Sequence, residues 1–151
     1  ISLTLALQFF SLQATQAQPS KVQEVMLDNG LKVILLENHK SPAVTFQVWY
    51  HVGSRNEQDG KSGLSHFLEH MMFKGTPDVG PEEHMRIIAK NGGRSNAFTM
   101  QDATVYFATM SREKIGIAIE LEADRMANAL LDGNYFDAEK KVVLEEQRLR
   151  T

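Results

Sequence analysis

The sequence predicts an α+β fold in which helices pack on a mainly antiparallel sheet. The chain has 151 residues, of which 42% are hydrophobic and 23% charged, and this balance is typical of a folded globular domain. Strand-like segments occur in two groups, and each group is followed by two segments with helical periodicity. Strands and helices that are segregated along the chain in this way are typical of α+β proteins.

The expected domain begins with a hairpin. Two strand-like runs are joined by Asp28-Asn29-Gly30, and Asn-Gly supplies the positive φ angles that a tight turn requires. A third run is rich in β-branched and aromatic residues, and two alternating runs follow later in the chain. The predicted strands are residues 22–27, 31–37, 43–52, 94–100 and 103–109.

Four helices are expected. The first ends before Gly75-Thr76-Pro77, and the second begins at Pro81, since proline is well tolerated at the first position of a helix. The predicted helices are residues 62–74, 81–90, 112–131 and 137–150. No repeat or low-complexity segment interrupts them, so residues 18–151 are interpreted as one domain.

The first seventeen residues carry no charge and include a short apolar run, which predicts a secretory leader. The run is too short to span a bilayer comfortably, and Thr15-Gln16-Ala17 resembles a cleavage site. Residues 1–17 are therefore expected to be a leader that is truncated at its start, and the protein to be periplasmic or secreted. A buried N-terminal helix is the alternative.

Charge and cysteine content exclude two kinds of site. The formal net charge is −3, with acidic and basic residues interspersed, so no basic patch that would bind nucleic acid is expected. The chain has no cysteine, so any metal ion must be bound by histidine and carboxylate side chains.

The segment His66-Phe67-Leu68-Glu69-His70 places two imidazoles and one carboxylate on one face of a helix. Imidazoles at positions i and i+4 can bind one Zn²⁺, and the carboxylate can reach a water molecule on that ion. The pattern predicts His66 and His70 as ligands of a single zinc ion and Glu69 as the general base. Ordinary surface or core histidines are the alternative, but they rarely produce this spacing.

A third zinc ligand is expected downstream, and it should be an acid because cysteine is absent. Glu139 and Glu146 share one face of the last predicted helix with two valines. Glu122 shares a face of the preceding helix with apolar residues that include Ile119. Glu146 or Glu122 could instead form an ordinary ion pair within its helix, as Glu122 could with Arg125. Helical geometry favours Glu146 as the ligand and leaves Glu122 open.

Three segments resemble the signature segments of the pitrilysin/insulinase peptidases, the M16 family. They are residues 63–76 (GLSHFLEHMMFKGT), 92–99 (GGRSNAFT) and 139–146 (EKKVVLEE). The similarity extends from about residue 22 to the end of the chain and is greatest to secreted bacterial members. It implies the metallohydrolase half-domain fold and zinc-dependent endopeptidase activity on short or unfolded polypeptides.

The resemblance also implies roles for individual residues. It implies Glu146 as the third zinc ligand, because the family places that glutamate about 76 residues after the second histidine. Glu139 matches a glutamate that assists from just outside the ligand shell. Asn96 and Ala97 match positions at which an edge strand holds an extended substrate.

Active members of the family bring further substrate-binding residues from a homologous second half or subunit. This chain is therefore expected to be the N-terminal half of such a peptidase, incomplete at its C-terminal end. The alternative function is a non-catalytic partner subunit or a peptide-binding module.

Overall fold

The computed structural model describes residues 22–150, in two compact units divided between Ser41 and Pro42. The predicted leader, residues 1–17, lies outside the described residues. Within residues 22–150, no helix combines the length and apolarity that crossing a membrane would require.

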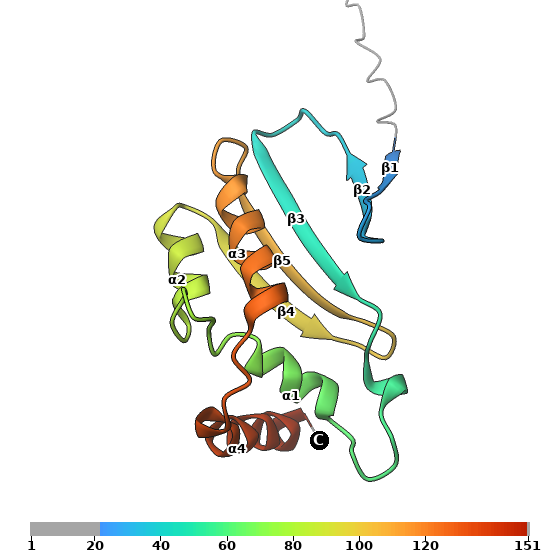
Figure 1. The fold of residues 1–151 in the computed structure, drawn as a ribbon, viewed down its shortest axis with the longest axis vertical. Helices are drawn as coiled ribbons and strands as arrows, with labels where there is room; N and C mark the ends of the chain where they lie inside the picture. The colour runs from blue at the N-terminus through green and yellow to red at the C-terminus, as the bar shows by residue number, and fades with distance from the viewer. Residues whose placement is uncertain (1–21, 151) are drawn as a thin grey trace, which may run out of the picture. The chain divides into compact units, whose positions relative to one another are not determined.

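The first unit is a two-stranded antiparallel hairpin, as the sequence predicts. Strand β1 (Val22–Met26) pairs with β2 (Lys32–Leu36), and Figure 1 shows both strands in blue. Gly30 adopts a φ of 84° in the turn, and the side chain of Asn29 accepts a hydrogen bond from the N–H of Leu31. A residue with positive φ explains why glycine suits this position.

The second unit contains a three-stranded antiparallel sheet in the order β3-β5-β4 (Figure 1). These strands are β3 (Ala43–Tyr50), β4 (Arg94–Thr99) and β5 (Thr104–Ser111). Side chains of the central strand β5 are mostly buried, whereas those of β4 alternate between exposed and half-buried. Within residues 22–150, β4 therefore forms an edge of the sheet.

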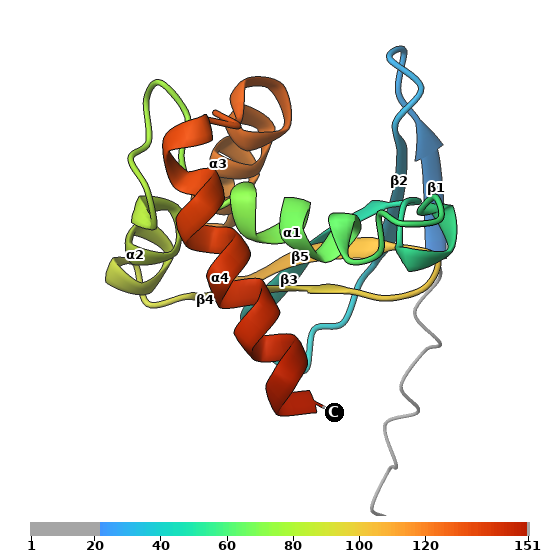
Figure 2. The same cartoon turned by 90° about the horizontal axis from the view of Figure 1, so that it is seen from below.

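The described part of the chain also has four α-helices, and a short 3₁₀ helix, η1 (Ser54–Asn56), in the loop after β3. The α-helices are α1 (Leu64–Met71), α2 (Glu83–Lys90), α3 (Ile115–Asn128) and α4 (Gly133–Arg150). Figure 2 shows α1 and α3 over the same face of the sheet. The expected class, helices on a mainly antiparallel sheet, is confirmed.

Several helix boundaries differ from the sequence prediction. Helix α2 begins at Glu83 rather than Pro81, because Glu82 takes a left-handed conformation with a φ of 60°. Helix α4 begins at Gly133, four residues before the predicted start. The extension places Phe136 within the helix, where its ring packs edge-to-face on Phe67 of α1 with centroids 4.7 Å apart. Tertiary contact thus extends a helix whose first residues are poor helix formers.

The core lies between β5, α2 and α3, and contains Ile88, Ala108, Met110, Ala118 and Leu121. The buried face of α3 differs from the predicted one. Glu122 is buried, but Ile119, which the sequence placed on the same face, is 45% exposed. The helix is rotated so that Leu121, Glu122 and Arg125 point inwards.

Candidate metal centre

The N-terminus of α1 is held by a carboxylate from the preceding loop. The two oxygens of Glu57 accept hydrogen bonds from the N–H groups of Gly63 at 2.8 Å and Ser65 at 2.7 Å. Partial burial raises the pKa of Glu57, but the bonds from Ser65 and Gly63 outweigh it, so the net pKa is below the usual value. An acid at a helix N-terminus satisfies otherwise unpaired N–H groups. Glu57 lies outside the usual capping position, so this contact was not predictable from the local sequence.

Three predicted ligands converge. The Nε2 atoms of His66 and His70 lie 3.2 Å apart, and the Glu146 carboxylate oxygens lie 3.5 Å from His66 Nε2 and 3.8 Å from His70 Nε2. One ligand atom from each residue falls within 4.8 Å of the others. Bonds of about 2.0–2.1 Å at tetrahedral angles place zinc ligands about 3.3 Å apart. The donor types and their spacing therefore fit one zinc ion.

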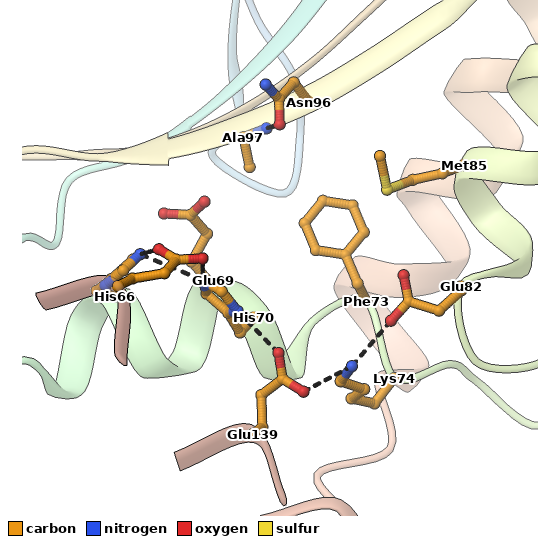
Figure 3. A pocket seen from close by; sticks show the side chains of 11 residues that line it. His66, Glu69, His70, Phe73, Lys74, Glu82, Met85, Asn96, Ala97 and Glu139 are labelled. Carbon is orange, nitrogen blue, oxygen red and sulfur yellow. Dashed lines mark hydrogen bonds and ion pairs between the residues drawn. The ribbon is translucent and has the colours of Figure 1, made fainter. Parts of the chain in front are cut away.

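Glu139 and Lys74 extend the site into a chain of polar contacts (Figure 3). Glu139 Oε1 lies 2.8 Å from His70 Nδ1, and its Oε2 lies 2.8 Å from Lys74 Nζ. Lys74 also contacts Glu82 Oε1 at 2.8 Å. Burial raises the pKa of Glu139, but hydrogen bonds from Lys74 and His70 outweigh it and lower the net pKa. A carboxylate on Nδ1 leaves Nε2 of His70 available as a ligand.

Glu69 occupies the inner side of the site, between α1 and β4. Glu69 is only 8% exposed, and its Oε2 accepts a hydrogen bond of 2.6 Å from the hydroxyl of Thr99. This contact joins residues thirty positions apart, so no local pattern predicted it. It ties the predicted general base to the edge strand.

One cleft of about 360 Å³ contains the predicted site residues. All seven of them line it: His66, Glu69, His70, Asn96, Ala97, Glu139 and Glu146. Four residues without a predicted role in the site also line it, namely Phe73, Lys74, Glu82 and Met85 (Figure 3). The fold thus places edge strand β4 beside the three candidate ligands.

Glu122, the competing ligand, lies outside this cleft. It is 5% exposed and forms a buried ion pair with Arg125, the ordinary pairing that the sequence allowed. The Arg125 guanidinium lies over the rings of Phe73 and Tyr106, 4.8 Å and 4.2 Å from their centroids. These contacts are of the cation–π type. Arg125 therefore joins α3 to the loop after α1 and to the central strand β5.

His84 is buried beside this pair, with Nε2 3.8 Å from Glu122 Oε2. Desolvation by burial, and secondarily the charge of Arg125, lower the pKa of His84 to about 4. Burial also raises the pKa of Glu122, although Arg125 acts in the opposite direction. His84 is thus a buried core residue.

The sequence pattern of the insulinase-type peptidases, peptidase family M16, matches residues 32–149. The match covers most of the chain, and the three signature segments fall within it. The chain belongs to the M16 peptidase family.

Individual relatives agree with this assignment. The zinc protease PqqE of Helicobacter pylori is 42% identical over 138 residues, which cover 90% of this chain and 31% of the relative. Subunit beta of the mitochondrial-processing peptidase of Blastocladiella emersonii is 35% identical over 127 residues, covering 83% of this chain and 27% of the relative. The crystal structure of a Helicobacter pylori protease matches with a TM-score of 0.83 and 41% identity, covering 87% of this chain and 32% of that chain. This chain therefore spans about a third of the length of these relatives.

Proposed function

We propose that this chain supplies the zinc site and the general base of an endopeptidase that hydrolyses short or unfolded polypeptides. The observation that carries the proposal is the convergence of His66, His70 and Glu146 in one cleft that also contains Glu69. The chain also belongs to a peptidase family whose members include a zinc protease, and this supports peptidase chemistry in general.

Three further side chains of the site have separate parts in the proposed hydrolysis. When bound, zinc supplies Lewis acidity, which polarises the peptide carbonyl and lowers the pKa of water to about 7. Glu69 accepts the proton of the attacking water and returns it to the leaving amine. Glu139 holds the ring of His70 in place through Nδ1, and Lys74 holds Glu139.

The substrate is proposed to bind along β4 as an added strand. The N–H of Ala97 donates a hydrogen bond of 2.9 Å to Oδ1 of the neighbouring Asn96. A carbonyl of the substrate peptide can replace this oxygen as the acceptor. Binding through main-chain hydrogen bonds depends only weakly on the amino-acid sequence of the substrate. It suits an enzyme that acts on many unfolded polypeptides.

A homologous second half or subunit is proposed to close the cleft in the complete protein. The relatives are about three times longer than this chain, and one of them is named as a subunit. Full-length protein and a version ending at Thr151 should be compared for folding, zinc content and kcat/KM on one unstructured peptide. Equal kcat/KM values would show that a second half is not required.

The protein is further proposed to act in the periplasm or outside the cell, because residues 1–17 have the composition of a secretory leader. Cell fractionation followed by N-terminal sequencing of the mature protein tests this. A mature form that retains these residues in the cytoplasm would contradict it.

The decisive test of function is Glu69→Gln in the full-length protein. The variant should retain zinc but lose about 10²–10⁴-fold in kcat, because an amide cannot accept the proton. A loss of less than about tenfold would remove Glu69 from this role. Peptide binding by the wild type without zinc-dependent hydrolysis would favour the alternative, a partner subunit or binding module.

A further inference from the structure

We propose that Thr99 is the positioning residue for Glu69. In this arrangement its hydroxyl fixes one carboxylate oxygen and leaves the other directed at the reacting water. The inference rests on the proposed function, since it concerns how the general base of that reaction is aimed.

The contact has the geometry of a strong hydrogen bond. Thr99 Oγ1 and Glu69 Oε2 are 2.6 Å apart, within the range of hydroxyl-to-carboxylate bonds. An ionised carboxylate only accepts hydrogen bonds, so the hydroxyl is the donor. Among residues 22–150, Oε1 of Glu69 has no hydrogen-bonding partner. One oxygen is therefore held and the other is available for proton transfer.

Neighbouring contacts leave the proton of Thr99 free for Glu69. Thr104, which pairs with Thr99 across the sheet, donates its own hydroxyl proton to the carbonyl of Val52 at 2.9 Å. The hydroxyl oxygens of Thr99 and Thr104 are 3.4 Å apart, so that contact is weak. A β-branched side chain also has few χ1 options. The strand backbone thus sets the direction of the donating hydroxyl.

Thr99 also connects the base to the proposed substrate strand. It lies two residues after Ala97 on β4, and alternate residues of a strand point to the same face. Ala97 and Thr99 are both half-buried on this face. One strand would therefore set both the position of a bound peptide and the orientation of Glu69.

A purely structural role makes a different prediction. If Thr99 only tied α1 to β4, its loss would lower stability and leave the turnover of folded, zinc-loaded enzyme unchanged. A positioning role instead lowers kcat per bound zinc and leaves KM nearly constant, because the base acts after binding.

The test uses the full-length protein with Thr99→Val, which keeps the shape of the side chain, and Thr99→Ser, which keeps the hydroxyl. Thr99→Val should bind one zinc per chain and lose about 10–100-fold in kcat, as expected for a hydrogen bond to a charged group. Thr99→Ser should restore kcat to within about threefold of the wild type, because the bond to Glu69 can re-form. In the Glu69→Gln background, Thr99→Val should cause little further loss, because residues that act as a unit are not additive.

Thr45→Val is the matched control. Thr45 on β3 also makes a hydroxyl contact across the sheet, to Thr109 at 3.0 Å, but it lies outside the cleft. Its kcat should equal that of the wild type. Thermal unfolding and zinc counting of every variant separate misfolding from a loss of turnover.

Two results would overturn the inference on Thr99 alone. One is Thr99→Val with unchanged kcat per zinc, and the other is Thr99→Ser as impaired as Thr99→Val. A wild type without zinc-dependent hydrolysis, or a fully active Glu69→Gln variant, would overturn the proposed function together with this inference.

Discussion

Lys74 of the loop after α1 and Glu139 of α4 form an ion pair with Nζ and Oε2 2.8 Å apart. Their side chains are 14% and 11% exposed, so solvent screens this pair less than it screens a surface pair. The other oxygen of Glu139 contacts the ring of His70. The pair therefore fixes a candidate zinc ligand from outside the ligand set.

Replacing Lys74 by methionine should weaken zinc binding by about 10–100-fold, the usual effect of losing an outer partner of a metal ligand. The apolar chain leaves Glu139 without its cation and His70 less firmly oriented. Competition with a chelator of known affinity measures the change. Lys90→Met, at an exposed position on α2, is the control and should bind zinc like the wild type. Equal affinities of the two variants would show that Lys74 has no part in the metal site.

Glu146→Gln should lose zinc during dialysis against a mild chelator, because it removes a charged ligand oxygen. Glu122→Gln should keep its zinc in the folded fraction but unfold at lower urea. Removing one partner of a buried ion pair costs about 3–5 kcal/mol, since Arg125 remains buried without a counter-charge. Metal counting and urea titration of both variants test the pair of expectations. A folded Glu122→Gln protein without zinc would reverse the ligand assignment.

Acidification should destabilise the fold through His84. Its pKa is about 4 when folded and near 6.5 when unfolded, so below pH 6.5 the unfolded state binds a proton first. The stability of the neutral, buried ring is therefore fully present above pH 6.5 and is lost as the pH falls towards 4. Between pH 7 and pH 5 this group should cost about 2 kcal/mol.

His84→Asn separates this contribution from the titration of carboxyl groups. The variant should lose less stability than the wild type between pH 7 and pH 5, as measured by urea unfolding at each pH. Parallel losses in both proteins would show that His84 does not become protonated on unfolding.

Ala97→Pro should raise KM for several unrelated unstructured peptides to a similar extent. Proline removes the N–H that is proposed to bind the substrate backbone, and an edge strand can accommodate it. Steady-state kinetics on a small peptide panel, with circular dichroism to check the fold, provide the measurement. An effect confined to one peptide would indicate recognition by a side-chain pocket instead of the strand.

Local geometry made the centre of the site predictable. His66, Glu69 and His70 lie on one helix, where a rotation of 100° per residue brings positions i, i+3 and i+4 to the same face. The same rule placed Glu139 and Glu146 together on α4. The hairpin at Gly30 and the strand from Arg94 to Thr99 were also expected, because turn residues and alternation are local signals.

Helix rotation was not predictable to the same degree. Apolar periodicity placed Ile119 and Glu122 on one face of α3, but the helix buries Glu122 against Arg125 and leaves Ile119 exposed. A charged residue can be buried only where a partner is available, and that partner's position depends on how the helix packs. The ring of Tyr106 under Arg125 comes from another element altogether.

The sequence by itself determined the family, through the resemblance of three segments to its signatures. It also determined the fold class and which side chains share a helical face, because these follow from composition and from spacing over a few residues. Only the tertiary structure decided that Thr99 holds Glu69, that Lys74 holds Glu139 and that Glu57 caps α1. The first two contacts join residues 30 and 65 positions apart, in segments whose separate patterns contain no information about one another. Packing of α1 against β4 and α4 brings them within hydrogen-bonding distance, and that packing depends on the shape of the whole core.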